Sequence, residues 1–216
     1  MRDIPMFTTE YGVASLVLRE IPYRQEAYIC IQSTQQPEEL LSECVQFCRA
    51  CGAEKIYARN HKCLEQYPVH TAVVKMRGIA HVDESKVRHL WPVTEETVTQ
   101  WRQFMNDRLK NVDNAGTLEA REEKEILKCG GTYFVHQDGV LLGGGWLTDG
   151  QLKLIAAALP GAGEQVMHTI LSLQPEQSVE LEVAETNTRA VRLYEKLGLV
   201  KTEELRKWHK IFPSDK

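Results

Sequence analysis

In the second part of the chain, hydrophobic positions switch repeatedly between the period of a strand and that of a helix. Residues 179–184 alternate apolar and acidic side chains, which predicts a strand. Thr186 and Asn187 then provide helix N-caps, and Gly198 provides a stop. The positions between them recur at helical spacing: Ala190, Val191, Leu193, Tyr194 and Leu197. The pattern therefore predicts a strand, a short loop and a helix in succession.

The whole pattern predicts an α/β fold with two parts. From residue 87 onward the expected order is strand, two helices, three strands, helix, strand, helix and two strands. The expected strands are 89–93, 132–137, 140–147, 151–157, 179–184, 200–205 and 207–212. The expected helices are 94–106, 117–128, 163–173 and 187–197. Asp-Gly pairs at 138–139 and 149–150 predict tight turns between strands.

The first part of the chain has its own strands and one helix. Strands are expected at 11–21, 27–33, 54–58 and 70–76, with a helix over 37–52. The polar segment 78–86 is expected to be a linker. We therefore expect one domain at 1–78 and another at 79–216. The first resembles a partial copy of the middle of the second, and could serve as a dimerisation or substrate-lid module.

Three cysteines, Cys44, Cys48 and Cys51, have the spacing of a radical-SAM iron–sulfur motif. A helix from Pro37 to Gly52 would instead place them on one buried face with Leu40, Leu41 and Phe47. Free cysteine behaves there as a small apolar residue. We prefer the packing interpretation and expect no metal.

Composition narrows the function classes further. The chain has 216 residues and a net charge of −4, so it has no basic footprint for nucleic acid. No apolar run reaches the roughly 20 residues that span a bilayer. No signal peptide is visible at the N-terminus, so we expect a cytoplasmic protein with no membrane partner. A homodimer stays open.

The helix from Asn187 resembles the last helix of the GNAT acyl-CoA N-acyltransferases. Their pattern, Asn-x-x-Ala-x-x-x-Tyr-x-x-x-Gly and an apolar residue, is matched by Asn187, Ala190, Tyr194, Gly198 and Leu199. The preceding Leu-Glu-Val, residues 181–183, is most similar to the branch that acetylates N-terminal amines of ribosomal proteins. With the element order, the resemblance covers about residues 87–212 and implies a GNAT-like mixed sheet flanked by helices.

The resemblance implies an acetyl-CoA-dependent transfer to a primary amine by direct attack. Glu182 is the candidate general base, and we expect its carboxylate to face inward and be partly desolvated, with Glu185 as the fallback. Tyr194 is the candidate acid, because a phenol with a pKa of about 10 is protonated at neutral pH. A structural carboxylate and a buried structural tyrosine are the alternatives.

The co-substrate is expected on the last of the three strands and the helix that follows it. The backbone of Ile155, Ala156, Ala157 and Ala158 would pair with the pantetheine arm, as an added strand does. The pyrophosphate would bind at a helix N-terminus. The expected residues there are Gly161, Ala162, Gly163 and Glu164, with Asn187 and Tyr194 from the last helix.

The phosphate loop departs from the family pattern. It is shorter, it lacks a basic residue, Glu164 adds an anion, and Gln165 stands where a small residue is expected. These departures support an alternative function, a non-catalytic acyl-CoA-binding sensor or scaffold. The identity of the amine acceptor cannot be derived from the sequence.

Overall fold

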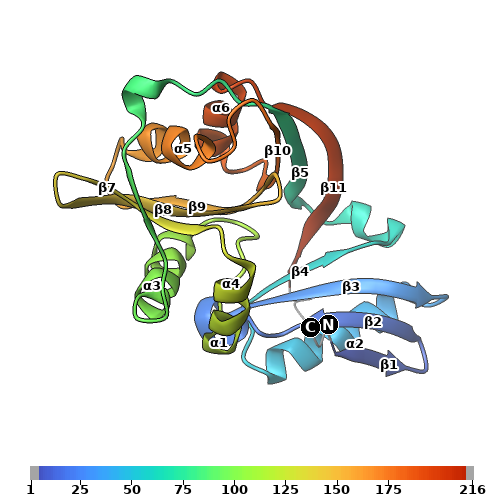
Figure 1. Ribbon diagram of the computed structural model, residues 1–216. Coiled ribbons are helices and arrows are strands. Elements are labelled where there is room, and N and C mark those ends of the chain that lie inside the picture. Colours follow the sequence, from blue (N-terminus) through green and yellow to red (C-terminus); the bar gives the residue numbers. More distant parts are fainter. Residues whose placement is uncertain (1–4, 213–216) are drawn as a thin grey trace. The chain divides into compact units, whose positions relative to one another are not determined.

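The computed structural model describes residues 5–212. It divides into two compact units, which are Met1–Ala72 with Leu205–Lys216, and Val73–Glu204 (Figure 1). The division passes through two strands, β5 (Val69–Ile79) and β11 (Val200–Ile211). It differs from the expected division after residue 78, and the suggestion that the first unit is a partial copy of the second stays a prediction.

The first unit is a sheet with one long helix against it. The strand order is β1-β2-β3-β4-β11, in which β3 and β4 are parallel and the other pairs are antiparallel. The strands are β1 (Met6–Thr9), β2 (Gly12–Val17), β3 (Glu26–Thr34), β4 (Lys55–Arg59) and the end of β11. The helices are α1 (Ile21–Arg24), α2 (Pro37–Ala50) and the 3-10 turn η1 (Lys62–Gln66).

Helix α2 explains two of the three closely spaced cysteines. Cys44 and Cys48 are fully buried in the core of the first unit, and burial raises the pKa of each thiol to about 12. Such thiols stay protonated and are poor metal ligands. The expectation that Cys51 and Phe47 share this face is wrong, because Cys51 follows the last residue of α2 and both side chains are exposed. Within residues 5–212 no group of three metal-ligating side chains is present.

The second unit is a mixed sheet covered on both faces. The strand order is β11-β5-β10-β9-β8-β7-β6. Its further strands are β6 (His89–Pro92), β7 (Thr132–Gln137), β8 (Val140–Thr148), β9 (Gln151–Ala157) and β10 (Ser178–Ala184). Its helices are α3 (Val98–Leu109), α4 (Glu123–Cys129), α5 (Gly163–Leu171) and α6 (Thr188–Lys196), with 3-10 turns η2 (Glu84–Lys86) and η3 (Ala120–Glu122).

The two helical layers have separate cores. Side chains of α5 and α6 pack with one face of the sheet, and those of α3 and α4 pack with the other (Figure 1). No helix of the described chain is long and apolar enough to cross a membrane.

Three consecutive glycines in β8 allow both layers to lie close to the sheet. A Cβ atom at Gly143 would lie 2.7 Å from Val166 Cγ2 of α5, and one at Gly145 would lie 2.9 Å from Ile170 Cγ1. On the other face, a Cβ at Gly144 would lie 3.2 Å from Trp101 Nε1 of α3. The run of three glycines is therefore a packing device.

Several sequence predictions are confirmed and others need correction. The Asp-Gly turns are present, with positive φ at Asp138, Gly139, Asp149 and Gly150. Helix α3 begins after Thr97 instead of Thr94, because residues 94–97 form a separate turn in which Thr97 Oγ1 accepts from Thr94 N at 2.9 Å.

Three further boundaries differ from the expected ones. The charged helix begins only at Glu123, and β11 is one strand where two were expected. One long strand forms because β11 follows β5 with its first part and β4 with its last. The expected linker 78–86 belongs to the second unit, where it packs against α5.

Gly143→Ala is expected to destabilise the protein by about 1–3 kcal/mol, because the added methyl group would collide with Val166 and the backbone oxygen of Ala156. Thermal unfolding would detect this as a fall of several degrees in Tm. Gly163→Ala is the matched control, since its Cβ would meet nothing within 4 Å. An equal loss in both variants would contradict the packing role.

Candidate functional site

The sheet of the second unit opens between two parallel strands. Strands β9 and β10 pair only at Gln151 with Glu180 and at Leu152 with Leu181. Beyond these residues, β9 continues to pair with β8 as far as Ala157, and β10 continues to pair with β5 as far as Ala184. The edges that β9 and β10 turn toward each other therefore carry backbone groups without a strand partner over about half of their length.

Both helices of one layer begin just beyond this opening. Helix α5 follows the carboxyl end of β9, and α6 follows the carboxyl end of β10. The first-turn N–H groups of a helix have no intrahelical acceptor, and they carry a partial positive charge. Crevices outside the carboxyl ends of parallel strands are where open α/β sheets bind ligands.

The loop before α5 leaves room for a ligand. A Cβ atom added at Gly161 or Gly163 would meet no atom within 4 Å, so packing within the chain does not require glycine at either position. Ala162 N donates to Leu159 O, and Val166 N donates to Ala162 O. The amides of residues 163–165 lie between these two bonds, in the first turn of α5.

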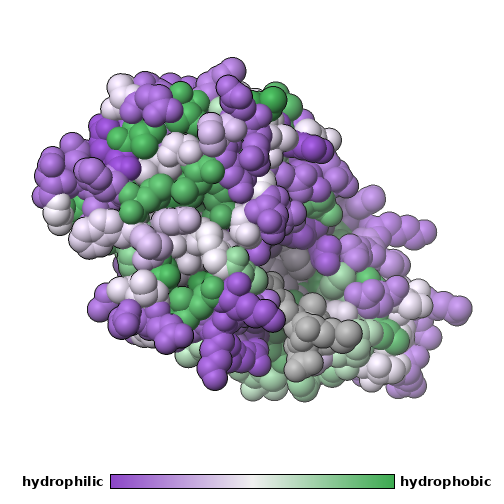
Figure 2. Space-filling view, in the orientation of Figure 1, coloured by the Kyte–Doolittle hydropathy of each residue, from purple (hydrophilic) through white to green (hydrophobic). Residues whose placement is uncertain are grey.

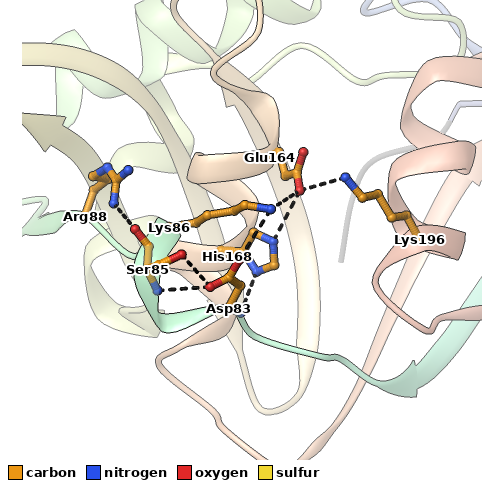
Figure 3. A network of polar contacts seen from close by, with 7 residues as sticks. All are labelled: Asp83, Ser85, Lys86, Arg88, Glu164, His168 and Lys196. Carbon is orange, nitrogen blue, oxygen red and sulfur yellow. Dashed lines mark hydrogen bonds and ion pairs between the residues drawn. The ribbon is translucent and has the colours of Figure 1, made fainter.

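Two lysines meet at the first turn of α5. Glu164 Oε1 accepts from Lys86 Nζ at 2.6 Å and from Lys196 Nζ at 2.9 Å (Figure 3). Lys86 comes from the segment between β5 and β6, and Lys196 comes from the last turn of α6. These hydrogen bonds, led by that from Lys86, lower the pKa of the Glu164 carboxyl to about 2. Lys86 Nζ also pairs with Asp83 Oδ2 at 3.4 Å, so two cations and two anions meet beside the helix N-terminus.

The segment 79–88, which we call the strap, holds Lys86 in place. Asp83 N donates to His168 Nδ1 at 3.0 Å, and Arg88 N donates to Thr169 Oγ1 at 2.9 Å. Both acceptors are on α5. His81 N donates to Leu197 O just beyond α6.

Helix α6 begins at the cap that the sequence predicts, and Val191 and Tyr194 are its buried residues. Asn187 is its N-cap, and its side-chain oxygen accepts from Ala190 N at 3.3 Å. Tyr194 is only 8% exposed, and burial raises the pKa of its phenol to about 12. Among the described residues no group forms a hydrogen bond with this hydroxyl. Tyr194 therefore holds its proton at neutral pH, which suits a donor.

The candidate base is not in the environment that we expected. Glu182 is exposed in the free protein, so the expectation of a partly desolvated carboxylate is wrong. An acidic side chain in the middle of β10 lies on the face opposite to Leu181 and Val183, which are the residues that reach the core. Glu180 and Glu185 form ion pairs with Lys75 at 3.1 Å and Lys201 at 3.0 Å.

The other expected contact residues border the opening. Ile155 and Ala157 of β9 pack toward α5, whereas Ala156 packs toward α3. Ala158 N donates to Leu142 O at 2.7 Å, so this amide is already used. Hydrophobic residues gather between α5 and the strands that it covers (Figure 2).

The fold is shared with known acetyltransferases. A GCN5-related N-acetyltransferase from Sphaerobacter thermophilus has a TM-score of 0.51 and 12% identity, over 92% of this chain and 75% of that one. One from Kribbella flavida has a TM-score of 0.53 and 13% identity, over 97% and 89%. A functionally unknown conserved protein from Staphylococcus epidermidis has a TM-score of 0.56 and 10% identity, over 97% and 94%.

The chain therefore has the GNAT fold, as the sequence predicted. No protein-family model matches it, and no curated protein matches its sequence significantly. Lys86 and Lys196 were not expected. Lys86 lies 78 residues before Glu164 in the sequence, and no local motif marks it.

Glu164→Gln is expected to destabilise the protein at pH 7 by up to about 1 kcal/mol, because two ammonium groups lose their shared anion at a partly exposed site. The lowered pKa means that this stabilisation is present above the ordinary value of 4.5 and is lost as the pH falls toward about 2. Urea unfolding at several pH values measures the difference. Glu125→Gln, on the exposed face of α4, is the control. A deficit independent of pH and salt would contradict the electrostatic origin.

Proposed function

We propose that this protein is an N-acetyltransferase that transfers an acetyl group from acetyl-CoA to a primary amine by direct attack. The observation that carries the proposal is the opening between β9 and β10, with a helix N-terminus beyond each strand. The GNAT fold of the neighbouring structures supports the same class of reaction.

The chemistry of the donors fits acetyl-CoA. The unpaired edge of β9, at Ile155, Ala156, Ala157 and Ala158, offers backbone groups to the amides of the pantetheine arm. The loop residues Gly161, Ala162 and Gly163 present first-turn N–H groups and open space to the pyrophosphate. Lys86 and Lys196 supply the positive charge that the loop itself lacks.

Glu164 would leave both lysines when phosphates bind, because one carboxylate and a diphosphate compete for the same ammonium groups. The two lysines can therefore stay paired with Glu164 in the free protein and pair with the phosphates in the complex. This exchange also removes the objection that Glu164 places an anion at the phosphate site.

The chain's own side chains would move the protons. Acetyl-CoA supplies the thioester. Glu182 removes a proton from the arriving ammonium, directly or through one water, since an exposed carboxylate is a weak base that solvent can reach. The amine nitrogen forms a bond to the carbonyl carbon as the carbon–sulfur bond breaks. Tyr194 Oη donates its proton to the leaving sulfur and takes up, through solvent, the second proton that the amine nitrogen loses as the amide forms. Asn187 fixes the start of the helix that carries Tyr194.

A non-catalytic acyl-CoA sensor is the second candidate. The exposed position of Glu182 favours it, because the desolvated site that was expected for a general base is not found there. Binding of acetyl-CoA with no acetylation of any amine would decide for this candidate. We propose a soluble protein with acetyl-CoA and an amine acceptor as its partners.

Acetyl-CoA at a hundredfold excess over its dissociation constant is expected to stabilise the protein by roughly 2.7 kcal/mol, a rise of about 5–10 °C in Tm. Differential scanning fluorimetry measures the shift. An unchanged Tm at millimolar acetyl-CoA, with the protein folded, would reject the co-substrate and with it both candidate functions.

The same assay tests the lysines. Lys86→Ala and Lys196→Ala should each weaken acetyl-CoA binding about tenfold or more, since each removes a charge-assisted hydrogen bond. Neither should weaken acetyl-pantetheine, which has no phosphate. Lys124→Ala, an exposed lysine of α4, is the control. Equal losses for both ligands would place the lysines away from the phosphates.

Tyr194→Phe is expected to keep acetyl-CoA affinity and to lower turnover by roughly 10²–10⁴, because only the proton donor is deleted. Glu182→Gln should lower turnover most at low pH, where the acceptor amine is fully protonated, while Glu180→Gln should have little effect. Acetylation of peptides with free N-terminal amines, followed by mass spectrometry, is the readout. Unchanged turnover in Tyr194→Phe would make this residue a packing tyrosine.

A further inference from the structure

The strap is attached to α5 by a bond that depends on one protonation state. His168 is 3% exposed, and its Nδ1 accepts the backbone N–H of Asp83 at 3.0 Å. A backbone amide can only donate, so Nδ1 must be unprotonated in this structure. The other ring nitrogen, Nε2, then carries the proton and faces Glu164 Oε1 at 3.7 Å (Figure 3).

Charged groups surround this histidine on three segments. Glu164 lies one turn before it on α5, Asp83 and Lys86 lie on the strap, and Lys196 reaches the same carboxylate from α6. Burial and then the Lys86 ammonium lower the pKa of His168, and Glu164 and Asp83 act in the opposite direction. The two lysines already use the Glu164 carboxylate, so it cannot fully stabilise a third cation.

We propose that His168 and the strap form a pH-sensitive latch, in which one proton on Nδ1 releases residues 82–87 from α5 and withdraws Lys86 from its first turn. A protonated Nδ1 would place one donor against the Asp83 N–H donor, and the bond would be lost. Two further hydrogen bonds contain no titrating atom, so they hold both ends of the released part. One joins His81 N to Leu197 O, and the other joins Arg88 N to Thr169 Oγ1.

The direction of the pH effect follows from the lowered pKa of His168. When the strap is released, the pKa of the imidazole has its ordinary value of 6.5. Attachment of the strap to α5 is therefore complete above pH 6.5 and is lost as the pH falls below that value. Glu164, with its pKa of about 2, stays ionised throughout this range. Asp83 also stays ionised, because hydrogen bonds from Ser85 lower its pKa.

The functional consequence rests on the proposed acetyl-CoA site. Lys86 lies on the strap three residues after Asp83, whose amide makes the bond to His168, and its ammonium contacts Glu164 in the first turn of α5. Release would therefore remove one of the two cations that are proposed to bind the phosphates. At pH values below 6.5, the affinity for acetyl-CoA should decrease by more than the titration of the phosphates alone explains.

Hydrogen exchange of the strap tests the latch without any ligand. After correction for the intrinsic pH dependence, protection of the Asp83 amide should fall by several-fold, and by no more than tenfold per pH unit, between pH 7 and pH 5. Unchanged protection over this range overturns the proposal. In the same sample, NMR of the wild-type ring should show Nδ1 protonation with the same midpoint as the change at Asp83.

His168→Asn separates the proton from the shape of the side chain. The amide oxygen of asparagine can accept from Asp83 N, and it does not titrate, so protection should become independent of pH. His81→Asn, at an exposed histidine of the strap, is the control and should behave as wild type. A wild-type pH dependence in His168→Asn overturns the proposal. If this variant does not fold, the wild-type NMR titration decides instead.

Acetyl-CoA affinity at pH 7.5 and pH 5.5 then separates the two proposals. The wild type should lose several-fold more affinity than His168→Asn, in which only the phosphate titrates, near pH 6. Equal losses in the two proteins reject the link between latch and site. No binding at either pH rejects the proposed function, while the exchange result still decides the latch.

Discussion

The loss of pairing between β9 and β10 is the constraint on which the rest of the second unit depends. Backbone N–H and C=O groups at a strand edge must find partners, and here two such edges face each other inside one sheet. Each strand keeps its other neighbour, so the opening is held from both sides without unfolding the sheet. The glycines of β8 let α5 lie close to the strands, which fixes the position of its first turn.

Charge at that first turn comes from segments far apart in the sequence. Lys86, Glu164 and Lys196 meet only because the strap, α5 and α6 pack together. A single glutamate at a helix N-terminus is favourable by itself, and the two lysines then find a local anion. The free protein is thus stable with both cations in place, and they need no rearrangement of the backbone to exchange one anion for another.

The order of the helices and strands could be predicted from the sequence because each of them has its own spacing of hydrophobic residues and ends at its own stop signal. The Asp-Gly turns, the Asn187 cap and Gly198 are local signals, and the structure confirms them. The start of α5 after the glycine-containing loop and the place of Tyr194 in α6 follow from the same kind of local signal.

What the sequence could not predict depends on contacts between distant residues. The alternation of residues 179–184 separates the two faces of β10, but tertiary packing decides whether the face of Glu182 is covered, and Glu182 is exposed there. The polar composition of 78–86 suggested a linker, because a segment bound through backbone amides has no hydrophobic pattern to reveal it. Cys51 was expected inside the helix, but α2 ends at Ala50, so the end of the helix and not its period decides the exposure of Cys51.

The pairing of β5 with β10 has a consequence for any attempt to divide the chain. Seven residues of β10, from Ser178 to Ala184, pair with Val73–Ile79. A fragment that begins at residue 79 would lack this partner, and β10 would become a bare edge on one side while remaining open on the other. Exposed edges of this kind invite aggregation. The second unit is therefore not separable at residue 79, where a domain boundary was expected, and any fragment of it must include Val73–Ile79.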